Sequence, residues 1–320
     1  MFGKKLVADM ISRSAENEQD RRSFLKAAGV AGLGTVGAVA LSGANVQSAS
    51  AAPTDAEISD AAVLNFALNL EYLEAQFYSY AYFGKGLDAS LLTGTTDPGV
   101  VTGGKKVKFK TDAIKDYAEE IANDEIAHVT FLRTALGGAK VSMPDIDLKA
   151  SFTAAARAAD LISSKQTFDP FANENNFLLA AFIFEDVGVT AYKGAAPLIN
   201  NKTYLDAAAG ILAVEAYHAG IVRSALYRKE LWTETRKISN LRDAVDGTTD
   251  ANGRVADDDQ KIRVDKTANI VPTDANGLVY SRAAADVLNI VYLTPTQVTK
   301  GGFYPSGVNG GINESNDNTP

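Results

Sequence analysis

The sequence predicts an all-α protein, a four-helix bundle with one long crossover, followed by a mostly irregular C-terminal extension. Three observations predict this fold. Four long segments carry apolar residues at a spacing of three or four, which is typical of helices with a buried face. The connection between the second and third segments is longer than the other two, as in bundles with one crossover. A Glu-x-x-His motif also occurs once in the second segment and once in the fourth.

The composition excludes several classes of protein. The chain has 320 residues, a net charge of −8 and no cysteine, and its pI is about 5.0. Without cysteine there is no disulfide framework, Cys-ligated zinc, iron–sulfur cluster or thiol catalysis. An acidic chain attracts nucleic-acid phosphates poorly, so we expect no nucleic-acid partner. The mean hydropathy of −0.07, and the lack of a run of about 20 apolar residues, exclude a multi-span membrane protein and predict no stable membrane insertion.

The N-terminus has the pattern of an export signal. Arg21 and Arg22 are followed by Ser-Phe-Leu-Lys, an uncharged Gly/Ala-rich stretch over 27–41, and Ala-Ser-Ala at 49–51. This pattern resembles a Tat signal peptide, which predicts removal of residues 1–51 and a periplasmic or extracellular protein. The mature chain would keep 25 basic and 35 acidic residues, a net charge of −10. The resemblance implies the Tat export machinery as a partner, and folding with any metal loaded before export.

The predicted helices begin and end at turn signals. The four long ones are expected over 54–83, 111–136, 170–199 and 203–232, and the first two stop at glycines. A shorter helical pattern covers 149–163 within the crossover. These elements predict a bundle domain over 52–232.

The remaining residues, 233–320, form the predicted C-terminal extension. Residues 245–275 indicate a loop, and 281–292 indicate one amphipathic helix. A disordered tail is one interpretation. An ordered wrap around the bundle is favoured because large apolar residues are spaced like anchors. These are Ile270, Val271, Leu278, Tyr280, Phe303 and Tyr304.

An internal repeat carries the chemistry. The pattern E-x-x-H-x4-R-[TS]-A-L occurs over 125–136 and again over 215–226. The first and third helices match more weakly, each with a Glu seven residues before a Tyr: Glu71 and Tyr78, Glu185 and Tyr192. The chain therefore has the pattern of two related helix hairpins, and predicts a bundle with pseudo-twofold symmetry.

The repeated motif predicts a metal site. Residues at i and i+3 lie on one helix face, so each Glu-x-x-His pair can hold one ion. Both pairs lie on apolar stripes, where an unpaired charge costs several kcal/mol. Four inward carboxylates would balance two divalent ions. The predicted metal-binding residues are Glu71, Glu125, His128, Glu185, Glu215 and His218.

Some assignments near this site stay open. Glu71 and Glu74 each align with apolar residues of the first helix, and the match of Glu71 to Glu185 favours Glu71. Asp186 would point about 100° away from Glu185, into solvent or towards the groups that support the ligands. Tyr78 and Tyr192 are interpreted as packing residues, with a hydrogen bond to a ligand carboxylate as an option, rather than as redox relays. The sequence assigns no catalytic residue and no organic cofactor.

One Glu from each of two helices, with Glu-x-x-His from each of two others, resembles the ferritin-like di-metal carboxylate proteins. The stretches NFALNLEYLEAQFY, FEDVGVTAYKGAAPL, NIVPTDANGL and GGFYPSGVNGG are similar to the exported ferritin-like group related to plant desiccation-related proteins. The resemblance spans about 60–310 and implies the same six ligands.

The resemblance leaves three functions open. Two ions per chain are expected, iron first and manganese as the alternative, because both metals accept carboxylate and imidazole ligands. The first function is a di-iron oxidoreductase acting on oxygen or peroxide in stress protection. The others are a manganese-catalase-like enzyme and a non-enzymatic stress protein with a structural metal. Self-association into a homo-oligomer stays open.

Overall fold

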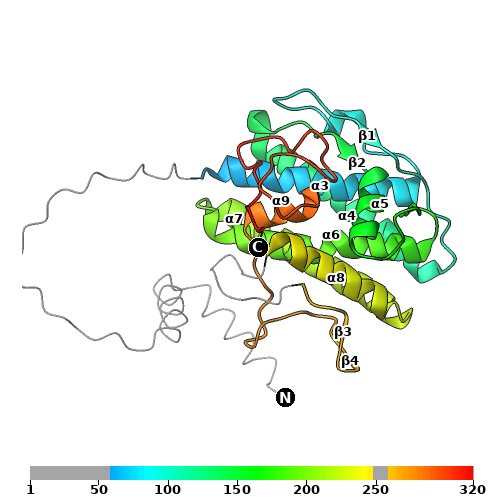
Figure 1. Ribbon diagram of the computed structural model, residues 1–320. Helices are drawn as coiled ribbons and strands as arrows, with labels where there is room; N and C mark the ends of the chain where they lie inside the picture. Colours follow the sequence, from blue (N-terminus) through cyan, green and yellow to red (C-terminus); the bar gives the residue numbers. More distant parts are fainter. Residues whose placement is uncertain (1–57, 248–258, 320) are drawn as a thin grey trace, which may run out of the picture. The chain divides into compact units, whose positions relative to one another are not determined.

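The computed structural model describes residues 58–247 and 259–319. The predicted export signal and the predicted start of the first helix lie outside these ranges. Four long helices form the bundle (Figure 1): Asp60–Phe83 (α3), Asp112–Leu136 (α4), Glu174–Ala195 (α6) and Lys202–Arg228 (α7). α3 packs along α4, and α6 packs along α7, as two helix hairpins. The predicted all-α class is confirmed.

Short polar side chains start three of the four helices. Ser59, Asn173 and Asn201 each accept a hydrogen bond from backbone N–H groups in the first turn of α3, α6 and α7. α3 ends at Gly84, whose φ of 77° places it in the left-handed region that glycine adopts without strain. α4 has no side-chain cap, but Glu174, the first residue of α6, accepts hydrogen bonds from the two N–H groups just before α4.

Two of the predicted helix ends differ from the structure. The fourth helix was expected to reach residue 232, but α7 ends at Arg228 and a further helix, Trp232–Asp246 (α8), follows. Glu230 separates them with a φ of 59°, which a continuous helix cannot contain. The third helix ends at Ala195 and continues as a 3-10 turn, Ala196–Leu198, which contains Pro197. α8 was not predicted.

The inter-helix connections contain little regular structure. A 3-10 turn, Ala89–Leu91, and a strand, Val101–Thr102 (β1), lie between α3 and α4. A second 3-10 turn, Gly137–Ala139, a strand, Ile146–Asp147 (β2), and a helix, Ala150–Ala158 (α5), lie in the crossover. β1 pairs in parallel with β2, which ties the two connections together.

The described part of the C-terminal extension packs against the bundle. It contains an antiparallel hairpin, Arg263–Val264 (β3) with Thr267–Ala268 (β4), and a helix, Ala284–Tyr292 (α9), which contacts α6 and α8. Phe303 packs its ring against those of Phe152 and Phe184, with centroids 4.9 and 5.0 Å apart. Tyr304 donates a hydrogen bond to Asn69 O (2.7 Å). Two of the predicted anchors, Val271 and Leu278, are instead exposed, at 66% and 56%.

Because the C-terminal extension covers the bundle, α3 and α6 are its inner helices. Seventeen of the 24 residues of α3 and 17 of the 22 of α6 are buried, against 10 of 25 in α4 and nine of 27 in α7. α4 and α7 therefore form the outer side of the bundle, while α3 and α6 are enclosed between them and the extension.

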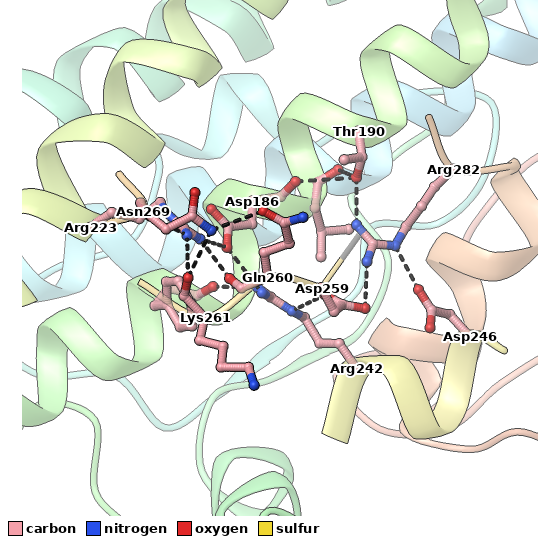
Figure 2. Close-up of polar contacts among 12 residues, drawn as sticks. Asp186, Thr190, Arg223, Arg242, Asp246, Asp259, Gln260, Lys261, Asn269 and Arg282 are labelled. Carbon is pink, nitrogen blue, oxygen red and sulfur yellow. Dashed lines mark hydrogen bonds and ion pairs between the residues drawn. The ribbon is translucent and has the colours of Figure 1, made fainter. Parts of the chain in front are cut away.

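A buried network of three arginines and three aspartates joins the extension to α6, α7 and α8 (Figure 2). Asp186 of α6 accepts from Arg223 of α7 (2.7 Å) and Arg242 of α8 (2.9 Å). Asp259 pairs with Arg242 and Arg282, both at 2.5 Å. Arg282 also pairs with Asp246 of α8 (2.7 Å), and the network balances in charge.

α7 is long and apolar enough to cross a membrane by length and composition alone, with a mean hydropathy of 1.3 in its most apolar window. It is the one such helix within the described ranges. The same composition is typical of core helices, and α7 turns the buried Glu215 and His218 towards the other helices. Its outer face lines an open groove of about 910 Å³ with the start of α4.

Glu174 ties the start of α6 to the start of α4 and the end of α7. Its carboxylate accepts hydrogen bonds from the N–H groups of Lys110 and Thr111 (2.8 and 2.9 Å) and from Lys229 Nζ (2.7 Å). Burial alone would raise the pKa of this carboxyl, but the hydrogen bonds outweigh burial and lower the pKa from 4.5 to about 2.

A carboxyl with a lowered pKa stabilises the fold above its unfolded pKa, and this stabilisation is lost as the pH falls through the folded value. We therefore expect Glu174→Gln to melt below the wild type at pH 7, and the difference in Tm to shrink between about pH 4.5 and pH 2. Melting curves of both proteins over this range check the prediction. A difference that does not change with pH would assign the effect to packing rather than to charge.

Candidate metal centre

The six predicted metal-binding residues come together in the middle of the bundle. Glu71 comes from α3, Glu125 and His128 from α4, Glu185 from α6, and Glu215 and His218 from α7; none is more than 8% exposed. They form two groups whose potential ligand atoms lie within 4.8 Å of one another. One group contains Glu71, Glu125, His128 and Glu215, and the other contains Glu185, Glu215 and His218. Glu215 belongs to both.

Both histidines turn Nδ1 towards the carboxylates. His128 Nδ1 lies 3.2 Å from Glu71, 3.6 Å from Glu215 and 3.7 Å from Glu125. His218 Nδ1 lies 3.2 Å from Glu125 and 3.7 Å from Glu185. The two rings are 6.3 Å apart, centroid to centroid. Each imidazole thus presents one nitrogen to the shared cluster, as a metal ligand would.

Several buried atoms of the cluster lack a hydrogen-bond partner. Both oxygens of Glu125, both of Glu215, one of Glu185 and Nδ1 of His218 are buried in this state. Buried polar atoms are normally satisfied, and these atoms have at most ion pairs within the cluster, so their surroundings suit a bound cation. Carboxylate oxygens and imidazole nitrogens suit iron and manganese, so the residues present fit a metal site.

The pKa values of the carboxyls indicate that the cluster favours added positive charge, as protons or as cations. Burial is the main cause that raises the pKa of Glu71 to about 7 and of Glu185 to about 8. Burial, with the charge of Glu125 next, raises that of Glu215 well above 4.5. Burial would also raise the pKa of Glu125, but the two histidines outweigh it and lower the value to about 2.

The pKa values of the two histidines are also raised, although burial acts on them in the opposite direction. Burial favours the neutral ring, but neighbouring carboxylates outweigh it and raise the pKa of His128 to about 11 and of His218 to about 9. Without metal ions, protons bound to the two histidines therefore supply positive charge to the cluster. Metal binding would replace these protons, because ligands bind in their deprotonated forms.

Tyr78 and Tyr192 take part in the cluster as hydrogen-bond donors. Tyr78 of α3 donates to Glu185, and Tyr192 of α6 donates to Glu71, in the symmetric pattern that the repeat predicts. Both hydroxyls are buried, and burial raises their pKa values well above 10. They are packed as predicted, and in addition they fix the orientation of one carboxylate on each inner helix.

The structure separates Glu71 from Glu74. Glu71 joins the cluster, whereas Glu74 belongs to neither group and lines a cavity of about 20 Å³ with Gly188 and Ile290 of α9. Asp186 is not solvated: it is buried in the arginine network, next in sequence to Glu185. Of the two alternatives for Asp186, solvation is therefore excluded.

Gly188 of α6 gives Glu215 its space. A Cβ at this position would lie 2.5 Å from Glu215 Oε2, so Gly188→Ala forces that carboxylate to move. Because Glu215 is shared by both groups, we expect the metal affinity of Gly188→Ala to fall by about 10-fold or more. Metal titration of this variant checks it beside Gly220→Ala on α7, where a Cβ meets nothing within 4 Å. Equal affinities of the two variants would contradict the close contact.

The arginine of the repeat has a role that the spacing did not reveal. Arg133 and Arg223 are both buried and point away from the cluster. Arg133 donates to Tyr72 and to the carbonyls of Ser90 and Thr93, and so holds the connection between α3 and α4. Arg223 donates to the carbonyls of Gln260, Lys261 and Asn269 of the extension. Each copy of the motif thus anchors one long loop.

A four-helix bundle that buries one Glu from each of two helices, and a Glu-x-x-His pair from each of the other two, defines the ferritin-like class. The chain belongs to this family, because the model of the ferritin-like domain matches residues 59–228.

Two curated relatives extend the comparison beyond the bundle. "Desiccation-related protein PCC13-62" of Craterostigma plantagineum is 30% identical over 79% of this chain and 83% of its own length. "Ferritin-like catalase Nec2" of Nesocodon mauritianus is 27% identical over 79% of this chain and 84% of its own. The first confirms the predicted relation to desiccation-related proteins. No solved structure matches the chain significantly.

Proposed function

We propose that this chain is an exported two-metal carboxylate protein that carries out redox chemistry on peroxide or oxygen in stress protection. The observation that supports it is the buried pair of Glu/His groups sharing Glu215, with orphaned oxygen and nitrogen atoms between them. Glu71, Glu125 and His128 would hold one ion, Glu185 and His218 the other, and Glu215 would lie between them.

Iron is the first candidate and manganese the second. A pair of such ions, when bound, supplies two electrons to an O–O unit or takes two from it. The protein's part is to hold the ligands and exclude bulk water. Tyr78 and Tyr192 orient Glu185 and Glu71, and the enclosed inner helices keep the carboxylates from solvent.

Peroxide is the favoured substrate. The similarity to a protein named a ferritin-like catalase supports it, although the identity is only 27%. Such a reaction converts two hydrogen peroxide molecules into one oxygen molecule and two water molecules. The test is to load the purified protein with iron or manganese and to follow peroxide loss and oxygen release together. Release of one oxygen per two peroxides supports catalase chemistry, whereas peroxide loss without oxygen release, sustained by an added electron donor, indicates a peroxidase.

A structural-metal stress protein is the second candidate. The 30% identity to a desiccation-related protein favours it, and metal binding to the native state alone would stabilise the fold. The measurement that separates the candidates is a melting curve with and without metal beside the peroxide assay. A large rise in Tm with no turnover of peroxide or oxygen would replace the redox proposal by this one.

Export by the Tat pathway is part of the proposal, supported by the sequence pattern at 21–51. We expect Arg21→Lys with Arg22→Lys to leave the precursor in the cytoplasm, because Tat-type recognition needs the arginine pair and not merely its charge. Cell fractionation measures this, with Lys4→Arg and Lys5→Arg as a control that exchanges basic residues elsewhere in the leader. Appearance of the twin-lysine variant outside the cytoplasm at the wild-type level would refute it.

A further inference from the structure

The two Glu-x-x-His pairs are equivalent in spacing but not in surroundings. The residue before Glu125 on α4 is Asp124, whereas the residue before Glu215 on α7 is Val214, and both are half-buried. Asp124 lies beside His218, the histidine of the other pair. An acidic side chain therefore stands beside one histidine, and the matching position of the repeat holds an aliphatic residue.

Asp124 holds His218 from the side opposite the cluster. Asp124 Oδ2 lies 3.1 Å from His218 Nε2, while Nδ1 of the same ring faces Glu125 and Glu185. An ionised carboxylate can only accept a hydrogen bond, so this contact keeps a proton on Nε2 and leaves the lone pair of neutral His218 on Nδ1. The Asp124 side chain is 43% exposed, so water solvates its charge on the outer side.

His128 has no such support. Its Nδ1 faces the carboxylates in the same way, but within 58–247 and 259–319 no acceptor lies in hydrogen-bonding position at its Nε2. The aliphatic Val214 offers no acceptor. The two halves of the repeat thus present the same ligand atoms with different control over the imidazole tautomer and ring orientation.

We propose that Asp124 is a positioning residue that fixes His218 in its ligating tautomer and makes the two metal positions unequal, with the tighter one beside His218. The inference rests on the proposed function to the extent that the cluster binds metal. The hydrogen-bond partner of a ligating histidine typically changes metal affinity by about 10- to 100-fold. The pair is therefore expected to fill in sequence, His218 side first.

The first test is a calorimetric titration of metal-free protein with Mn²⁺. Wild type is expected to bind two ions in two resolved steps. Asp124→Val should weaken the tighter step by about 10- to 100-fold and leave the other unchanged. Val214→Asp should strengthen the weaker step and so reduce the difference in affinity between the two steps. Asp116→Val, which removes an exposed acid from the same helix, is the matched control and should behave as wild type.

The second test observes the imidazole directly. The chain has only two histidines, so the Zn²⁺-loaded protein with ¹⁵N-labelled histidine gives two ring systems, assigned by His218→Gln. We expect a protected Nε2 proton on His218 in wild type and in Asp116→Val, but not in Asp124→Val. Asp124→Asn, whose side-chain oxygen still accepts, should restore it. A merely structural role of Asp124 would not produce this pattern.

The outcomes separate this inference from the proposed function. If wild type binds two ions but Asp124→Val matches Asp116→Val in both binding steps and in the His218 signal, the positioning role is overturned and the metal site stands. If wild type binds no ion, both fail. Selective weakening of one step, with loss of the His218 proton, supports the inference.

Discussion

A Glu185→Gln variant is expected to hold one metal ion instead of two and to lose all turnover of peroxide and oxygen, while the bundle stays folded. Glu185 belongs to the His218 group alone, and glutamine keeps an oxygen for the Tyr78 hydroxyl but removes the charge that faces His218. The other group retains its three carboxylates and His128, so its ion should stay. Chemistry that needs two electrons from a pair of ions then stops. Metal analysis, melting curves and the peroxide assay on one preparation measure all three effects.

The matched control is Glu74→Gln. Glu74 is a buried carboxyl three residues after Glu71, but it lies outside both groups. We expect this variant to keep two ions and its activity. Loss of an ion from Glu74→Gln, or retention of both ions by Glu185→Gln, would contradict the assignment of ligands.

An Asp259→Asn variant is expected to lose about 3–5 kcal/mol of unfolding free energy. Asp259 is fully buried between Arg242 and Arg282, with both contacts at 2.5 Å. Removing its charge leaves three buried arginines facing two carboxylates, and a buried charge without its partner is strongly destabilising. The expected fall in Tm is on the order of 10 °C.

Denaturant unfolding of Asp259→Asn beside Asp265→Asn measures this effect. Asp265 is an exposed aspartate in the same extension with a φ of 46°, a conformation that asparagine tolerates well, so its substitution should change stability by less than about 0.5 kcal/mol. Equal stability of the two variants would show that the extension does not depend on the arginine network. A large difference would make the extension an integral part of the fold.

The sequence contains enough information to predict the bundle and the six clustered residues. Each Glu-x-x-His pair needs only the 3.6-residue period to place both side chains on one face, and the repeat identifies the partner helix. Glu71 and Glu74 could not be separated by periodicity alone, because α3 is buried on nearly all sides and both side chains align with apolar neighbours. The weaker match to Glu185 selected the residue that the structure places in the cluster.

The features that the sequence could not predict depend on contacts between distant segments. The angle of Asp186 on α6 left solvent open as its surroundings, but Arg223 and Arg242 reach it from two other helices. α8 was missed because most of its residues are polar, and the break before it was not visible because nothing in the sequence marks Glu230 as left-handed. The contact of Asp124 with His218 joins residues 94 positions apart. The difference between Asp124 and Val214 at matching places in the repeat was visible in the sequence and could have indicated it.

The most direct test of the central claim is the metal content of the protein purified from its own host, measured after dialysis. We expect about two ions of iron or manganese per chain in wild type, and a lower content in His128→Ala and in His218→Ala. Two results would contradict a two-metal centre built on these residues. One is wild-type protein that holds no metal after loading and dialysis, and the other is equal metal content in wild type, His128→Ala and His218→Ala.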